Sequence, residues 1–341
     1  MTPKAKVRIA LAIGILVAIL LMGLALRDVE WPIILSSLKN ANFLFVIPIS
    51  MALMLQYWFK ALRWKILLNP FASVATAQVF PATVVGYLAN LVFPAYLGEF
   101  ARVYLLGKQL RLRYSSVMAT VVLERFFDFL SVLFFVGIVL IADSSAPAEL
   151  KTVGVVAGAA SGALLLMLAA VLVWTEALTR LVLKMTAFLP DAIGDRLAEQ
   201  LALGAVGLQS VRDLRRIPSI AVTSLLQWGA MGLCIYLGMI GTGLQVPLSA
   251  GFVVLALTVM GVTLPSSPGF FGTIQLCFTL GLAPYGIAAS EAFAASIFFH
   301  LTIYVAGWAA GLYYLRQSGL TLGGLHNASI DQENRSLHDR H

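Results

Sequence analysis

The fold of this chain is decided by a stretch at residues 116–141, which reads SVMATVVLERFFDFLSVLFFVGIVLI. It is longer than the ~20 residues that an α-helix needs to cross the hydrocarbon core of a bilayer. Within its first half it carries Glu124, Arg125 and Asp128. Charged side chains are costly inside a membrane, and those that occur there usually mark a functional site. This stretch therefore predicts both a spanning helix and a candidate site.

The whole chain has the composition of a membrane protein. Of its 341 residues, 60% are hydrophobic and only 11% are charged, and the mean hydropathy is +0.90. A soluble domain usually carries about 25% charged residues, so lipid must be the solvent for most of this surface. Only helices and closed barrels satisfy their backbone hydrogen bonds in lipid, and long unbroken apolar runs favour helices. We predict an all-α polytopic membrane protein.

Full spanning helices are predicted at residues 7–26, 43–62, 116–141, 152–174, 218–241 and 289–315. The first of these runs follows Lys4, Lys6 and Arg8, as a signal peptide would. Its apolar stretch exceeds the ~7–15 residues of a signal peptide core, and no A-x-A cleavage pattern follows it. We therefore expect a retained spanning helix.

Two further apolar regions are interrupted by residues that break helices or are rare in lipid. They are residues 75–97, with Pro81, Asn90 and Pro94, and residues 249–286, with Pro265, Pro268, Gly269 and Gly272. If the first region enters and leaves the membrane on one side, most of the 23 Lys and Arg residues share a side with the basic N-terminus. Only Arg27, Lys39 and Lys151 then face the opposite side, as the positive-inside rule favours. This arrangement predicts a re-entrant hairpin that opens to the cytoplasm, with both termini cytoplasmic.

The second region is either a hairpin or two short crossings, because both leave the C-terminus on the same side. Two breaks, one in each half, are typical of a midplane binding site in an inverted-repeat transporter. We predict two opposed re-entrant or broken-helix hairpins, related as an inverted repeat, within a single transmembrane domain at residues 1–317. Residues 175–217 are read as amphipathic helices on the cytoplasmic surface or as a charged loop, and residues 318–341 as a polar cytoplasmic tail.

The first candidate cluster lies at residues 90–102, with Asn90, Glu99 and Arg102. Pro94 and Gly98 break the helix there, while Glu99 and Arg102 share a helical face because they are three residues apart. A broken helix beside an acid and a base is suited to a zwitterionic or anionic headgroup. The alternative is a local salt bridge at the membrane boundary.

The second candidate cluster is formed by Glu124, Arg125 and Asp128. Glu124 and Asp128 lie one helical turn apart, so they repel each other unless a cation separates them or one is protonated. Arg102, Arg125, a substrate amine or a coupling proton would serve. The alternative is a buried structural ion network that ties this helix to the first hairpin.

The third candidate cluster lies at residues 263–275 and includes Ser266, Ser267, Gly269 and Gln275. A helix that begins after Gly269 would direct its positive end toward the turn, which suits a phosphate. The alternative is a structural kink.

Other polar residues of the apolar runs are read as structural. His300 is expected to pack and hydrogen-bond rather than relay protons, and Lys60, beside Gln56 and Tyr57, to reach the membrane interface. Arg63 and Trp64 are read as interface anchors. The chain has no H-E-x-x-H, Cys/His cluster or G-x-S-x-G motif, so we expect no catalytic residue, metal, cofactor or nucleic-acid partner.

In this order, these motifs resemble the transmembrane flippase domain of the lysylphosphatidylglycerol synthase/flippase family. The matching elements are Arg63-Trp64, Asn90 to Arg102 with its Pro-x(3)-Gly-Glu-x-x-Arg core, Glu124-Arg125-x-x-Asp128, and Pro265-x-x-Pro268-Gly269-x-x-Gly272. The likeness runs from about residue 8 to residue 316. The family pattern ends the third motif with Glu where this chain has Gln275, which counts against a cationic, lysine-bearing substrate.

The resemblance implies translocation of a phospholipid or lipid-linked molecule across the bacterial cytoplasmic (inner) membrane. The headgroup would enter between the hairpins, with Arg102 and Arg125 on its phosphate and the three acids balancing charge or meeting an amine. Because only a short tail follows the last span, we expect a stand-alone member that works with a separately encoded lipid-synthesising enzyme. Two alternatives stay open: an enzyme that modifies lipid headgroups, and a non-transporting partner of one.

Overall fold

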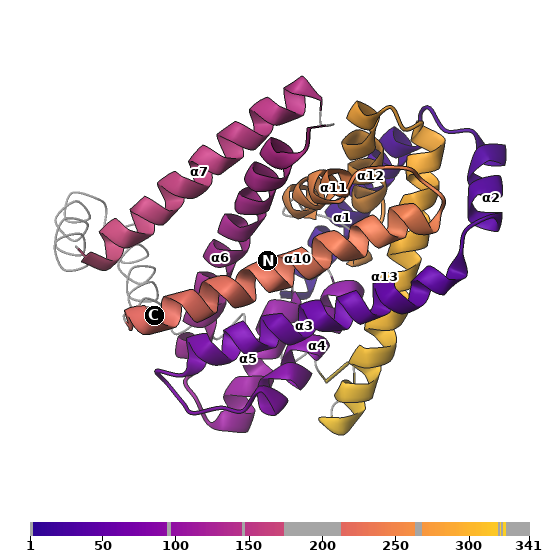
Figure 1. Cartoon of the computed structure of the whole chain (residues 1–341). Helices are drawn as coiled ribbons and strands as arrows, with labels where there is room; N and C mark the ends of the chain where they lie inside the picture. Colours follow the sequence, from indigo (N-terminus) through magenta and orange to yellow (C-terminus); the bar gives the residue numbers. More distant parts are fainter. Residues whose placement is uncertain are drawn as a thin grey trace.

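The computed structural model describes residues 3–93, 97–144, 147–173, 213–262, 268–319, 321 and 323–324. Every element in this part of the chain is a helix (Figure 1). The elements are α1 (Pro3–Ala25), α2 (Trp31–Lys39), η1 (Phe43–Phe45), α3 (Val46–Leu68), α4 (Thr76–Val92), α5 (Leu97–Leu110), α6 (Tyr114–Ala142), α7 (Ala148–Val173), η2 (Leu214–Arg216), α10 (Ile217–Gly241), α11 (Leu248–Val262), η3 (Pro268–Phe270), α12 (Thr273–Leu282), η4 (Ala283–Tyr285) and α13 (Ala289–Gln317).

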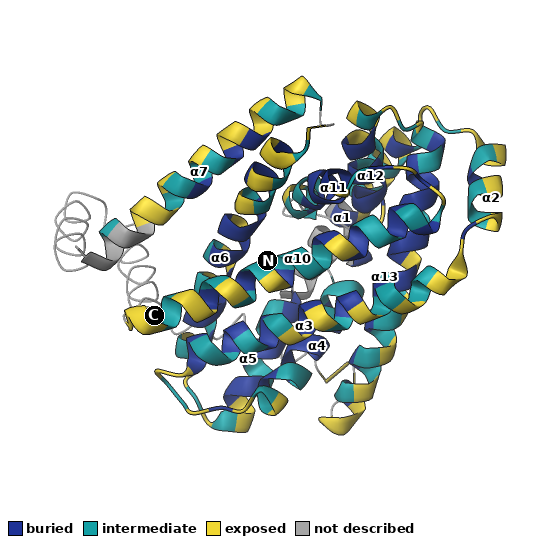
Figure 2. Cartoon of the chain, viewed as in Figure 1, coloured by how far each residue is buried: buried dark blue, intermediate teal, exposed yellow. Residues whose placement is uncertain are grey.

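Five helices of the described residues are long and apolar enough to cross a membrane, namely α3, α6, α7, α10 and α13. Helix α1 covers the first predicted span. Large apolar side chains lie exposed along the outer faces of the bundle, among them Leu44 at 72% and Leu166 at 73% (Figure 2). Such a continuous apolar surface suits contact with lipid. The chain is an all-α, multi-pass membrane protein, as the sequence predicts.

Both interrupted regions form helical hairpins, but the first is longer than predicted. Helix α4 continues through Pro81 and ends at Val92, just before Pro94, since a proline disfavours helical conformation in the residue before it. The chain then returns as α5, which packs along α4. The returning limb therefore extends from Leu97 to Leu110, beyond residue 97, where the predicted region ended.

The order helix, hairpin, helix occurs twice, as α3, α4–α5, α6 and as α10, α11–α12, α13. The contacts are reciprocal: α3 packs along α10, α6 lies on α11 of the second hairpin, and α13 lies on α4 of the first. This is the pattern that a two-fold repeat gives. The inverted relation of the halves to a membrane remains a prediction.

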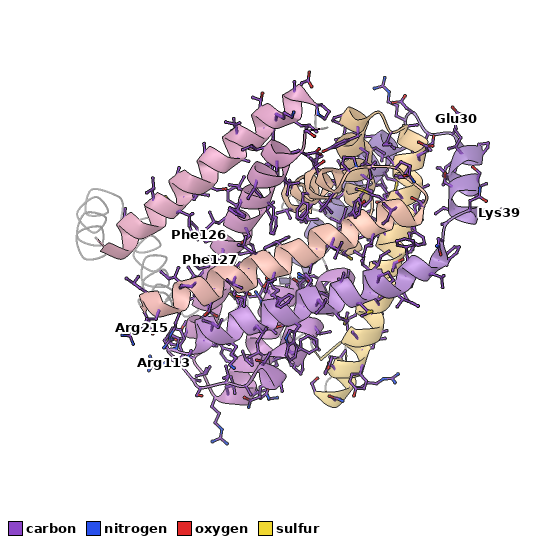
Figure 3. The ribbon with its side chains drawn as sticks, viewed as in Figure 1. Glu30, Lys39, Arg113, Phe126, Phe127 and Arg215 are labelled. Atoms are coloured by element: carbon purple, nitrogen blue, oxygen red, sulfur yellow. The ribbon has the colours of Figure 1, made fainter. Side chains whose placement is uncertain are left out.

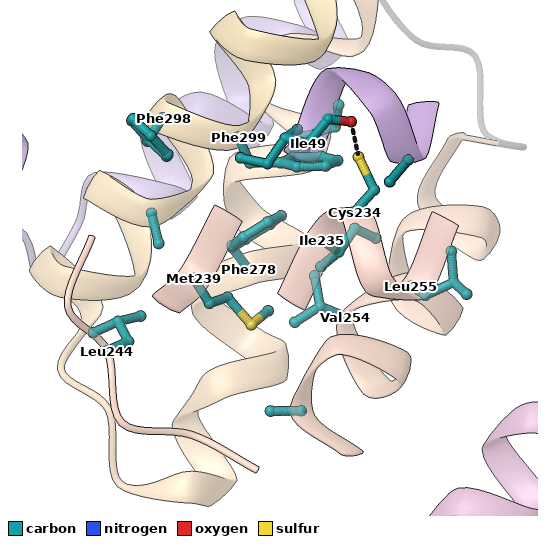
Figure 4. Close-up of a cluster of buried hydrophobic side chains, with 14 of the residues drawn as sticks. Ile49, Cys234, Ile235, Met239, Leu244, Val254, Leu255, Phe278, Phe298 and Phe299 are labelled. Atoms are coloured by element: carbon teal, nitrogen blue, oxygen red, sulfur yellow. Dashed lines mark hydrogen bonds between the residues drawn. The ribbon is translucent and has the colours of Figure 1, made fainter. Parts of the chain in front are cut away.

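The largest apolar core lies where α3, α10, α11, α12 and α13 meet (Figure 4). The fully buried Phe278 and Phe299 pack near its centre with their rings tilted by 34°, and Cys234 Sγ lies 3.5 Å from the carbonyl oxygen of Ile49. Cys234 and Cys277 are both free and buried. The cysteines therefore pack as apolar side chains.

Charged residues mark two opposite ends of the bundle. Figure 3 shows Arg113 and Arg215 close to each other at one end and Glu30 and Lys39 at the opposite end. This agrees with the predicted grouping of basic segments on one side. Helix α2, which carries Lys39 and packs against α13, was not predicted.

Candidate functional site

The tips of the two hairpins meet in the middle of the bundle. The Tyr304 hydroxyl on α13 donates to the carbonyl oxygen of Leu91 at the end of α4, at 3.1 Å. The turn η3 of the second hairpin also contacts α4. Beside the tips is a cavity of about 180 Å³, lined by residues of α3 to α6 and α10 to α13. The two predicted hairpins therefore share one enclosed space.

The first hairpin depends on a close approach of its two limbs. A Cβ atom at Gly98 would overlap the carbonyl oxygen of Gly86 on α4, so only glycine fits there. Asn90 Oδ1 accepts a hydrogen bond from the Gly98 amide at 2.9 Å, which satisfies a free N–H at the start of α5. Asn90, a predicted binding residue, thus lines the cavity while its carboxamide oxygen holds the hairpin closed.

The two acids of α6 are separated by cations, as predicted, but by different ones. Arg63 Nη2 lies 2.5 Å from Asp128 Oδ1 and 3.3 Å from Glu124 Oε1, and Arg63 Nη1 donates to Ser224 at 3.0 Å. The Lys60 ammonium lies 3.6 Å from Asp128 and 3.8 Å from Glu124. Both cations come from α3 and are almost fully buried.

The predicted Arg102 and Arg125 complete the cluster from the side of the first hairpin. Arg102 lies 2.5 Å from both Glu99 and Glu124, and its guanidinium stacks 4.6 Å from the centre of the Trp64 ring. Arg125 pairs with Glu99, and the Arg125 side chain is 47% exposed. Glu99 is therefore shared between two arginines from different helices.

The second half of the chain also reaches this cluster. Asp128 Oδ1 accepts hydrogen bonds from Trp228 Nε1 at 2.9 Å and from Gln227 Nε2 at 3.3 Å, both on α10. Buried charges are tolerated only when they are paired and hydrogen-bonded. The cluster therefore links α3, α5 and α6 through ion pairs and α10 through hydrogen bonds.

Lys60 and Arg63 are the functional residues that sequence reasoning missed. The predicted span ended at residue 62, which placed Arg63 outside it, whereas α3 continues to Leu68. The expectations of interface contact for Lys60 and of an anchor for Arg63 are wrong, because their exposures are 3% and 0%. The spacing of Gln56, Lys60 and Arg63 at i, i+4 and i+7 put them on one helical face, which was the available signal.

Only part of the charged cluster faces the cavity. The cavity is lined by Lys60, Glu99, Arg125 and Asp128, while Arg63, Arg102 and Glu124 lie behind them. Arg102 does not reach the position in which it was predicted to meet a phosphate. The cavity lining also includes aliphatic side chains of the second half, namely Leu255, Val259, Val262, Ile274 and Ile303.

The second hairpin tip is held by neutral hydrogen bonds. Gly269 and Gly272 have φ of 73° and 83°, the left-handed region that favours glycine. Gln275 Oε1 accepts from the Gly272 amide at 2.8 Å, and His300 Nε2 lies 2.8 Å from the Gly269 carbonyl oxygen. That nitrogen must carry the hydrogen, so Nδ1 accepts from the Gln275 amide at 3.1 Å.

This arrangement bears out the hydrogen-bonding reading of His300. Helix α12 begins at Thr273 rather than directly after Gly269, and its first free amide is capped by Gln275. Gln275 is buried and lies outside the cavity lining, while Gly269 belongs to it. The predicted residues Ser266 and Ser267 lie outside the described residues.

Comparison with known proteins gives one family and two relatives. A family model described as "Lysylphosphatidylglycerol synthase TM region" matches residues 11–311. A UPF0104 membrane protein of Methanothermobacter thermautotrophicus is 35% identical over 153 residues, which cover 42% of this chain and 43% of that protein. Glycosyltransferase AglD of Haloferax volcanii is 24% identical over 144 residues, 41% of this chain and 22% of that protein. The chain thus matches less than half the length of either relative, and no solved structure shows a significant match.

Proposed function

We propose that this chain, which belongs to the family of the lysylphosphatidylglycerol synthase transmembrane region, translocates a phospholipid or lipid-linked molecule across its membrane. The family places the chain among multi-pass membrane proteins of lipid modification and transport. Within that class, flipping is the activity that the cavity supports best. We further propose the bacterial cytoplasmic membrane as its location, with both termini cytoplasmic.

The observation that carries the proposal is the amphipathic cavity beside the two hairpin tips. Lys60, Arg125, Glu99 and Asp128 contribute charged groups to its lining, and the second half contributes aliphatic side chains. A lipid has the same division, with a polar headgroup and an apolar tail. A site that offers paired charges within a membrane removes most of the penalty for moving a headgroup through hydrocarbon.

The broken helices would allow a lipid to reach this cavity from the membrane. Irregular backbone at membrane depth is tolerated where it lines a cavity, and transporters with such helices move one repeat against the other around a central site. Here the turn η3 of the second hairpin contacts α4 of the first, and Tyr304 on α13 donates a hydrogen bond to the carbonyl oxygen of Leu91 in the other half. Relative movement of the halves would open the cavity first to one leaflet and then to the other. No catalytic step is assigned to the chain.

The test is leaflet exchange of fluorescent lipids with different headgroups, measured in liposomes that contain the purified protein. We expect exchange that depends on the headgroup, and a fall of at least about tenfold for Glu99→Gln and Asp128→Asn. Asp213→Asn is the matched control, because this exposed acid contacts its sequence neighbours Arg215 and Arg216 and does not line the cavity. Variants must elute as monodisperse protein before they are compared.

Two outcomes would contradict the proposal. One is the absence of exchange for every lipid tested, with an established flippase active in the same liposomes. The other is exchange at equal rates in the wild type and in both site variants. In either case the partner role becomes the better candidate, because one relative is named a glycosyltransferase and this chain resembles only part of it.

A further inference from the structure

Among the described residues, no acceptor lies within hydrogen-bond distance of the Lys60 ammonium. Lys60 is only 3% exposed and lines the cavity. Its nearest carboxylate oxygens, on Asp128 and Glu124, lie 3.6 and 3.8 Å away, beyond hydrogen-bond distance. The Tyr87 ring lies 5.7 Å from the same ammonium. A lysine ammonium has three N–H donors, so the site holds donors for a ligand oxygen.

The described charged cluster has one more cation than anions. Its cations are Lys60, Arg63, Arg102 and Arg125, and its anions are Glu99, Glu124 and Asp128. Uncompensated charge is unfavourable where water is scarce, and a ligand of opposite sign relieves it. An anionic ligand would oppose this surplus at Lys60, the buried cation of the cluster that lines the cavity. A zwitterion would leave the excess unchanged, and a cationic headgroup would increase it.

A second polar side chain, next to Lys60, also has a hydrogen-bonding atom without a partner. Gln56 lies one turn before Lys60 on α3, is 4% exposed and lines the cavity. Its Nε2 donates to the Tyr87 hydroxyl at 2.8 Å, while its Oε1 is buried without a partner. If the amide is turned the other way, its N–H group is the unpartnered one. Either way, one polar atom of Gln56 remains for a ligand hydroxyl.

From these three observations we infer that the cavity binds an anionic phosphate ester that bears hydroxyl groups, with Lys60 on the phosphate and Gln56 on a hydroxyl. The aliphatic part of the cavity lining assigns the ester to a lipid rather than to a free metabolite. This inference deepens the proposed function and rests on it for the lipid, but the phosphate site itself is independent of transport.

Calorimetric binding to the purified protein in neutral detergent tests the inference without any transport step. The probes are dihexanoyl-phosphatidylglycerol, which is anionic and carries hydroxyls, and the zwitterionic dihexanoyl-phosphatidylcholine and dihexanoyl-phosphatidylethanolamine. Glycerol 3-phosphate reports a free phosphate ester. We expect phosphatidylglycerol to bind at least about tenfold tighter than either zwitterion, since charged hydrogen bonds are the strong ones.

Three variants test whether Lys60 produces the preference for phosphatidylglycerol. Lys60→Gln should weaken phosphatidylglycerol binding at least about tenfold, and Lys60→Arg should keep it within a few-fold. Lys65→Gln, in the last turn of the same helix, is the matched control and should bind as the wild type does. If Lys60→Gln fails to fold, the headgroup preference of the wild type still decides the question.

The possible results separate the binding site from the transport function. Equal affinity for phosphatidylglycerol and phosphatidylcholine, no binding of any probe, or an unchanged preference in Lys60→Gln would overturn the inference. Equal affinity for glycerol 3-phosphate and phosphatidylglycerol would support the phosphate site and contradict its assignment to a lipid. Phosphatidylglycerol binding that depends on Lys60, without leaflet exchange in liposomes, would support the inference and contradict the proposed function.

Discussion

The tips of the two hairpins occupy corresponding places in the two halves, but different chemistry holds them. In the first half, Glu99 at the start of α5 forms ion pairs with Arg102 and Arg125. In the second half, Gln275 at the start of α12 forms neutral hydrogen bonds with His300 and the Gly272 amide. Both arrangements satisfy buried polar groups next to a broken helix.

The difference lies in what each arrangement connects. The neutral bonds stay among η3, α12 and α13, so the second tip is fastened within its own half. The charged cluster includes Asp128, which also accepts from Gln227 and Trp228 on α10, and therefore joins the two halves. A charged ligand interacts much more strongly with the first arrangement than with the second. The first half is thus the part that a ligand should reorganise, and the second half the part that should stay fixed.

The largest expected effect follows from removing the cation at the centre of the charged cluster. Arg63→Leu would remove the closest cation of the buried Asp128, which would then face Glu124 with the more distant Lys60 and the partly exposed Arg125 beside it. Breaking a buried ion pair from one side typically costs about 3–5 kcal/mol. We expect a loss of that size in the free energy of unfolding, measured by titration with sodium dodecyl sulfate in mixed micelles.

The control for this variant is Arg215→Leu, which removes an exposed arginine at the end of the bundle (Figure 3). Surface substitutions usually change the free energy of unfolding by less than about 0.5 kcal/mol. If Arg63→Leu is no less stable than Arg215→Leu, the cluster does not stabilise the first half as described.

A smaller loss is expected from Gly98→Ala, which tests the backbone of the first hairpin rather than its charges. The added methyl would overlap the Gly86 carbonyl oxygen and push α5 away from α4. Overpacking of this kind costs about 3 kcal/mol at the upper end of its usual range. Gly162→Ala on α7 is the control, because nothing lies within 4 Å of its new methyl, and it should be neutral or slightly stabilising. Equal stability of the two variants would refute the close approach of the limbs.

Much of the fold was predictable because spanning helices need only length and apolar composition. The runs at 116–141 and 289–315 became α6, Tyr114–Ala142, and α13, Ala289–Gln317. The ends of the helices were harder to predict, because an apolar run stops at the first charged residue whereas a helix can continue past it. Helix α5 illustrates this, because its Arg102 pairs with Glu124 on α6 and is buried without being apolar.

The sequence predicted most of the residues of the charged cluster, but it predicted less well which residues pair with one another. Glu99, Arg102, Glu124, Arg125 and Asp128 do form one cluster. Sequence spacing shows which residues share a helical face, but it does not show which helix faces that surface, so the contribution of α3 was missed. The interhelical partners of Asn90 and Gln275 were equally invisible, because they are set by the packing of the hairpins.

The neutral hydrogen bonds at the tip of the second hairpin should contribute less to the free energy of unfolding than the charged cluster does. Gln275→Leu would leave the Gly272 amide and His300 Nδ1 without their partners. An unsatisfied buried polar group typically costs about 1–3 kcal/mol, and we expect about 2 kcal/mol in the same titration. Phosphatidylglycerol binding should change little, since Gln275 lies outside the cavity lining. A variant that binds the lipid at least tenfold more weakly would show that the second tip is not the fixed part.

The smallest expected effect comes from the same change, threonine to valine, made once in each half. Thr120→Val on α6 removes the acceptor of the Trp64 indole N–H, 2.9 Å away, and Trp64 in turn supports the Arg102 guanidinium. We expect a loss of about 1 kcal/mol. Thr302→Val on α13 removes only a bond from the hydroxyl to the Phe298 carbonyl of its own helix, and it should be nearly neutral. Because the two changes are chemically identical, a larger loss at Thr302 than at Thr120 would place the greater sensitivity in the second half and reverse the comparison.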